Sequence, residues 1–69
     1  MAKDTQLRDL RWLLRERLPE LRVERGDREN RFDLIDASNG VPMAEAVTAA
    51  EIGCLVAGTM SLGQLRQPR

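Results

Sequence analysis

Residues 47–65 read Val-Thr-Ala-Ala-Glu-Ile-Gly-Cys-Leu-Val-Ala-Gly-Thr-Met-Ser-Leu-Gly-Gln-Leu and carry a single charge, that of Glu51. Thr48 lies three residues before Glu51, and together they have the pattern of a capping box. In this motif the side chain of each residue accepts a hydrogen bond from the backbone N–H of the other. We therefore predict a helix that Thr48 caps and that runs to about residue 57. Gly58 should end it, because glycine readily adopts the left-handed conformation found after many helices.

The predicted helix is apolar or small on nearly every side, and such a helix is expected to be buried all round. Its bulky face consists of Ile52, Leu55 and Val56. Its other face, called here the small-residue face, consists of Ala50, Gly53, Cys54 and Ala57. Glycine costs about 1 kcal/mol relative to alanine inside a helix, so close packing against a second helix would offset that cost. The first helix of the same chain is expected there, with a two-fold dimer or another partner as the alternatives.

Two segments before this helix have the alternating pattern of strands. Residues 21–25 place apolar and charged side chains in turn, which is the period of a half-buried strand. Residues 31–36 form the second strand, although Ile35 departs from its alternation. The polar residues 26–30 between them have the length of a hairpin connection.

A turn and a third strand follow. Residues 37–40 end in Asn39-Gly40, the strongest short hairpin signal, because both residue types tolerate a positive φ. Residues 41–46 are predicted to form an edge strand, since Pro42 has no N–H to donate to a neighbouring strand.

A first helix is predicted over residues 4–18. Leucines recur there at helical spacing, at Leu7, Leu10, Leu14 and Leu18. Asp4 or Thr5 can cap its start, and Pro19 should end it because proline disfavours the helical conformation of the preceding residue.

These elements predict one small α+β domain over residues 1–69, in the order α-β-β-β-α. Both helices should pack on one face of a three-stranded antiparallel sheet. The pattern Ser61-Leu-Gly-Gln64 repeats the capping box weakly and predicts a last short turn. Residues 1–3 and 66–69 are expected to fray. A domain of this length has a single core and buries only roughly 60% of the surface that its unfolded chain exposes.

The composition gives little support to catalysis or to a metal or organic cofactor. The chain has one cysteine and no histidine, so it holds no internal disulfide, and Cys54 is expected to be a small buried hydrophobe without a base to activate it. Asp33, Asp36 and Glu45 have no recognised metal-binding spacing. We therefore predict a protein that is not an enzyme, with no catalytic, cofactor-binding or metal-binding residues.

A membrane location is not expected either. The amino terminus lacks the apolar run of a signal peptide. The longest uncharged run, residues 52–65, is interrupted by small polar residues and falls short of the roughly 20 residues that span a bilayer. We expect a cytoplasmic protein.

One surface of the first helix is a candidate binding site. It consists of Arg8, Arg11, Trp12 and Arg15, and is called here the Arg–Trp flank. Trp12 lies just outside the leucine stripe, and the arginines four residues before and three residues after it are its neighbours on the helix. Tryptophan and arginine are enriched at binding hot spots. The alternative is that Trp12 folds over the edge of the core and that the arginines are merely solvated.

The chain is therefore expected to bind another protein, as an accessory factor, adaptor or inhibitor, and a homodimer remains open. The alternative is a nucleic-acid-binding accessory protein that uses the same arginines. The order of elements resembles that of the double-stranded RNA-binding domain. That family has a lysine-rich motif where this chain has Thr48, Ala49, Ala50 and Glu51. The net charge is zero, from 11 basic and 11 acidic residues, which makes a phosphate-binding surface the less favoured reading.

Overall fold

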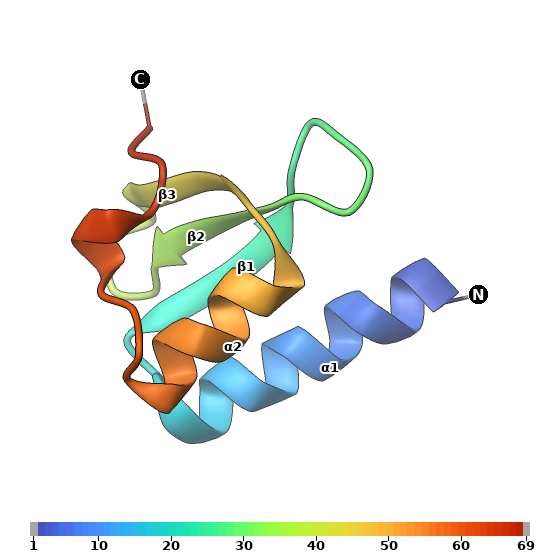
Figure 1. Cartoon of the computed structure of the whole chain (residues 1–69), viewed down its shortest axis with the longest axis horizontal. Helices are drawn as coiled ribbons and strands as arrows, with labels where there is room; N and C mark the ends of the chain where they lie inside the picture. Colours follow the sequence, from blue (N-terminus) through green and yellow to red (C-terminus); the bar gives the residue numbers. More distant parts are fainter. Residues whose placement is uncertain (1, 69) are drawn as a thin grey trace.

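Two helices cover one face of a three-stranded antiparallel sheet (Figure 1). The computed structural model describes residues 2–68, with side chains from residue 6 onward. Its elements are α1 (Ala2–Arg17), β1 (Leu21–Arg25), β2 (Phe32–Asp36), β3 (Pro42–Val47), α2 (Ala49–Ala57) and the short 3-10 helix η1 (Leu62–Gln64). The order α-β-β-β-α confirms the predicted fold class.

The first helix begins earlier than predicted. It starts at Ala2 rather than at residue 4 and ends at Arg17, shortly before Pro19. The predicted caps, Asp4 and Thr5, are side chains that lie outside the described ones. The observed end agrees with the restriction that proline places on the residue before it.

The core lies between the helices and the sheet. Its buried side chains are Leu7, Leu10, Leu14, Val23, Phe32, Leu34, Ala44, Val47, Ile52 and Leu65. The described residues include no buried polar or charged side chain. Leu55 and Val56 pack partly buried against this cluster, as the bulky face of the second helix predicted. The buried side-chain contacts between the two layers are therefore all apolar.

β1 and β2 pair along their whole length, from Leu21 opposite Asp36 to Arg25 opposite Phe32. Their connection begins at Gly26, where an added Cβ would lie 2.9 Å from a backbone carbonyl oxygen. Glycine is therefore required at this close approach of two chain segments. The predicted connection over residues 26–30 is formed.

The turn between β2 and β3 differs from the predicted turn in one respect. Of the pair Asn39-Gly40, only Gly40 has a positive φ, of 76°, and its N–H donates to the carbonyl of Asp36 at 2.8 Å. The hydroxyl and the N–H of Ser38 donate to Oδ1 of Asp36 at 2.6 and 2.8 Å. Both bonds lower the pKa of Asp36 below its usual value, and the bond from the Ser38 hydroxyl has the larger effect. The aspartate side chain therefore shapes the turn without a left-handed Asn39.

A bulge interrupts β3. The register moves by one residue between the pair Leu34–Ala44 and the pair Phe32–Val47. Within the bulge, Ala46 adopts a left-handed φ of 54°. A residue with a Cβ pays roughly 1–2 kcal/mol for that conformation, so this position stores strain.

The outer edge of β3 is covered. Pro42 contributes no donor there, and the N–H of Glu45 donates to the carbonyl of Arg66 at 2.9 Å. Leu65, which is only 4% exposed, anchors this segment in the core, and Figure 1 shows the segment beside β3. Arg66 belongs to the range 66–69 for which we expect fraying, and its carbonyl is nonetheless bonded to the sheet.

The predicted capping box of α2 is formed. The N–H of Glu51 donates to Oγ1 of Thr48 at 3.1 Å, and the N–H of Thr48 donates to Oε1 of Glu51 at 2.8 Å. Gly58 follows the helix with a φ of 82°, and its N–H donates to the carbonyl of Leu55. Both ends of this helix are therefore fixed by residues that the sequence singled out.

We expect Ala46→Gly to raise the free energy of unfolding by up to about 1 kcal/mol, because glycine adopts a positive φ without the Cβ clash. Urea denaturation would measure the change. The matched control is Ala44→Gly, which removes a buried methyl group from the same strand and should destabilise the protein by roughly 1 kcal/mol. Equal losses in the two variants would contradict strain at Ala46.

Candidate functional site

Trp12 lies on the surface of α1, with 62% of its side-chain and backbone area exposed. The alternative in which it folds over the edge of the core is therefore excluded. The other large hydrophobic residue found exposed in the described part of the chain is Val41, at 50%. An exposed indole offers a large apolar surface for burial against a partner.

The arginines of the Arg–Trp flank are not equivalent. Arg8 and Arg15 are exposed and lie one helical turn from Trp12 on either side. Arg11 instead turns toward β1, where its Nε donates to the carbonyl of Val23 at 3.4 Å and its terminal nitrogen to Oε1 of Glu24 at 3.3 Å. The sequence could not separate these roles, because both are open to an arginine on the flank of a helix.

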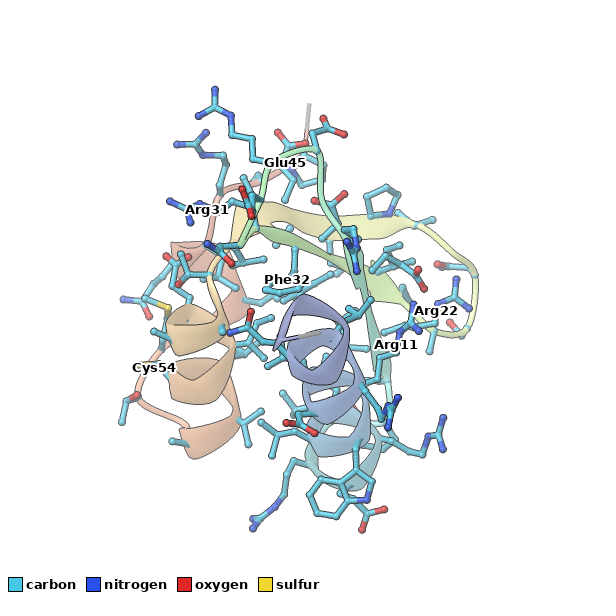
Figure 2. The ribbon with its side chains drawn as sticks, turned by 90° about the vertical axis from the view of Figure 1, so that its right-hand side faces the viewer. Arg11, Arg22, Arg31, Phe32, Glu45 and Cys54 are labelled. Atoms are coloured by element: carbon cyan, nitrogen blue, oxygen red, sulfur yellow. The ribbon has the colours of Figure 1, made fainter. Side chains whose placement is uncertain are left out.

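Arg11 reaches around the outer edge of β1. Val23 points into the core and is fully buried, so the next side chain, Glu24, points to the opposite face of the sheet. Glu24 also forms an ion pair with Arg22, whose Nε lies 3.3 Å from Oε2 of Glu24. Figure 2 shows Arg11 and Arg22 on the same side of the molecule. Because the side chains of Arg11 and Glu24 are 48% and 39% exposed, their ion pair contributes at most about 1 kcal/mol.

A groove of about 390 Å³ runs between α1 and β1 at this place, and is called here the α1–β1 groove. Its charged lining residues are Arg11, Arg15, Arg22 and Glu24, which leave two positive charges in excess. Its apolar lining includes Leu14 and Leu21. Arg15 belongs both to this groove and to the Arg–Trp flank, so the two features form one continuous surface.

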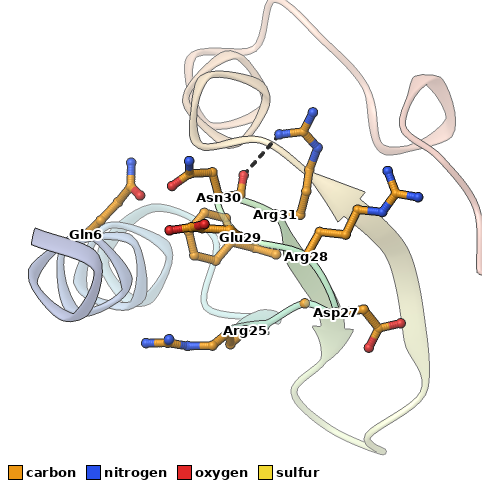
Figure 3. Close-up of a pocket in the computed structure, with 9 residues that line it drawn as sticks. Gln6, Arg25, Asp27, Arg28, Glu29, Asn30 and Arg31 are labelled. Carbon is orange, nitrogen blue, oxygen red and sulfur yellow. Dashed lines mark hydrogen bonds between the residues drawn. The ribbon is translucent and has the colours of Figure 1, made fainter.

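A second hollow, of about 240 Å³, lies at the connection between β1 and β2 (Figure 3). Its charged lining residues are Arg25, Asp27, Arg28, Glu29 and Arg31. Arg31 donates to the carbonyl of Asn30 at 3.2 Å, and Figure 3 shows Arg25 pointing away from Arg28 and Arg31. Divergent arginines interleaved with carboxylates do not form a convergent anion site.

The small-residue face of α2 is not covered by α1. Ala50, Cys54 and Ala57 are exposed, and a Cβ added to Gly53 would meet no atom within 4 Å. The expected packing of the first helix on this face is therefore wrong, as is the expected burial of Cys54. Figure 2 shows Cys54 on the side of α2 away from α1. Side chains this small expose little apolar area, so the face tolerates water.

Two of the acidic residues considered above, Asp33 and Asp36, have structural partners. Oδ1 of Asp33 accepts the N–H of Ala46 at 3.3 Å, and Asp36 accepts the two bonds from Ser38. In the described part of the chain, no three histidine, cysteine or acidic side chains gather in a way that would hold a metal ion. No helix within residues 2–68 has the length and hydropathy to cross a membrane.

Comparisons with protein-family models, with curated proteins and with solved structures give no match for this chain. The likeness in element order to the double-stranded RNA-binding domain therefore gains no support beyond that order. A function has to be argued from the surface itself, and Trp12 with the adjoining groove combines an exposed aromatic residue with an excess of two positive charges.

We expect Gly53→Ala to raise the free energy of unfolding by about 0.5–1 kcal/mol, because alanine favours the helix and the added methyl group meets open space. Chemical denaturation at several protein concentrations would measure this change. The reverse substitution at an exposed position of the same helix, Ala50→Gly, serves as the control and should lower stability by a similar amount. A concentration-dependent loss in Gly53→Ala would instead indicate that a second copy covers the small-residue face.

Proposed function

We propose that this protein is a non-catalytic module that acts by binding another protein, as an accessory factor, adaptor or inhibitor. The observation that supports this most directly is the 62% exposure of Trp12 on α1. Its helical neighbours Arg8 and Arg15 are exposed as well. A tryptophan flanked by arginines has the composition of a binding hot spot, in which a few large side chains contribute most of the affinity.

The α1–β1 groove extends this surface. Arg15 borders both Trp12 and the groove, and the groove carries two positive charges in excess. A partner that buries the indole would therefore meet basic side chains beside it, which favours an acidic surface on the partner. The small-residue face of α2 lies elsewhere and remains a candidate for self-association, which would give a homodimer.

The location is proposed to be the cytoplasm. Cys54 is exposed and unpaired, and a thiol of this kind stays reduced in that compartment. A nucleic-acid partner is the less favoured candidate, because the acidic residues Asp9 and Glu16 are also exposed on α1 and reduce its basic character.

The test uses the tagged protein as bait in extracts of the source cells and compares two variants, Trp12→Ala and Val41→Ala, with the parent protein. Trp12→Ala should weaken capture of the partner by about 30-fold or more, which corresponds to about 2 kcal/mol. Val41→Ala removes the other exposed large hydrophobic residue and should leave capture unchanged. Both variants should keep their stability within about 0.5 kcal/mol of the parent protein.

Two outcomes would contradict this function. If Trp12→Ala unfolds the protein, the exposed indole serves the fold and not a partner. If the variant captures the same proteins equally well, the flank is not the binding surface. Capture that is abolished by nuclease and falls steeply as salt rises would instead identify a nucleic-acid partner.

A further inference from the structure

The outer edge of β1 presents backbone groups to the α1–β1 groove. The carbonyl of Glu20 and the N–H of Gly26 both take part in hydrogen bonds across to the β2 side, at 2.9 Å. Bonded and non-bonded pairs alternate in an antiparallel ladder, so the even-numbered residues of β1 are those bonded to β2. The backbone N–H and C=O groups of Leu21 and Val23 therefore point outward.

The two edges of the sheet are protected differently. The β3 edge has a proline, a bulge and the bond between Glu45 and Arg66. At the β1 edge, the N–H of Leu21 donates to the carbonyl of Leu18 at 3.0 Å, and Arg11 lies over the carbonyl of Val23 at 3.4 Å. Proteins normally protect an edge strand against pairing. At its centre, β1 is protected by one side chain, that of Arg11, whose contacts are long and half exposed.

The charges beside this edge favour one kind of chain. Arg11 and Arg15 come from α1 on the helix side, and Arg22 projects from the opposite face of the sheet. A strand added to an edge places alternate side chains on the two faces. Carboxylates on either face of an added strand would therefore meet an arginine.

We propose that the α1–β1 groove binds an extended, acidic segment of the partner protein, which pairs with the outer edge of β1 as a fourth strand. This mode of recognition combines backbone hydrogen bonds with side-chain contacts in the flanking groove. It rests on the proposed function, for which it names the binding element of the partner. Arg11 leaves the carbonyl of Val23, and a carboxylate of the incoming segment replaces Glu24 as its ion-pair partner.

A second copy of this chain fits the edge less well. Two β1 strands related by a two-fold axis at Val23 would place Arg22 of one copy opposite Glu24 of the other, which is favourable. The same pairing would bring the groove arginines of both copies together, and each groove already holds two positive charges in excess. The like charges oppose that dimer, whereas an acidic segment neutralises them.

The test uses a blocked peptide of alternating glutamate and valine, titrated into the full chain labelled with nitrogen-15. We expect the largest amide shifts at residues 21–25 and at Ala37, which line or border the groove. A peptide of identical side chains with every backbone amide methylated has no N–H to donate to the strand and should bind at least about 10-fold more weakly, as expected for the loss of a few backbone hydrogen bonds. A lysine–valine peptide should not bind.

Variants of the protein test the arginines. Arg22→Ala and Arg15→Ala should each weaken binding of the glutamate peptide about threefold, the effect of losing one half-exposed ion pair. Arg17→Ala is the matched control, because Arg17 is an exposed arginine of the same helix that does not line the groove. It should leave the affinity unchanged.

Three results would overturn the proposal. These are equal binding of the methylated and unmodified peptides, absence of binding by the glutamate peptide, and amide shifts at residues 21–25 that depend on protein concentration without any peptide. The last result would assign the edge to a second copy. The capture experiment with Trp12→Ala is independent of these results, so strand addition can fail while the protein-binding function stands.

Discussion

Burial of Leu14, Leu34 and Ile52 between the sheet and the two helices is the contact on which the other features depend. Each is at most 1% exposed, and they come from α1, β2 and α2. No polar side chain is buried among the described residues, so no internal hydrogen-bond network or buried ion pair orients the two layers. A domain of this length has one apolar core, and each element can turn only one face toward it.

This one-sided core determines what remains on the surface. The sheet has its second face free of helices, and both of its outer strands are edges. The chain closes the β3 edge with its own C-terminal segment, which Leu65 holds in the core. The β1 edge is covered by Arg11, whose contacts are long and half exposed. The difference between a backbone-bonded edge and a side-chain-covered edge is the reason why we propose strand addition at β1 and not at β3.

The two surfaces that the sequence singled out differ in what surrounds them in the folded protein. The Arg–Trp flank is continuous with a groove, and its tryptophan has no place in the core. The small-residue face of α2 has no helix against it, because Ile52 turns the opposite side of α2 toward the sheet. Exposing a face of alanine, glycine and cysteine to water costs little free energy, because its apolar area is small. The structure therefore does not require another helix or a partner to cover this face.

The sequence by itself determined the local structure. Thr48, Glu51 and Gly58 fixed the ends of α2 because capping depends on a few neighbouring residues, and the alternation in residues 21–25 identified β1. Only the tertiary structure decided that Trp12 is exposed, that Arg11 crosses the edge of β1 and that α1 leaves the small-residue face open. Helical periodicity gives the angle between side chains, but the side of the helix that meets the core depends on contacts between segments distant in the chain.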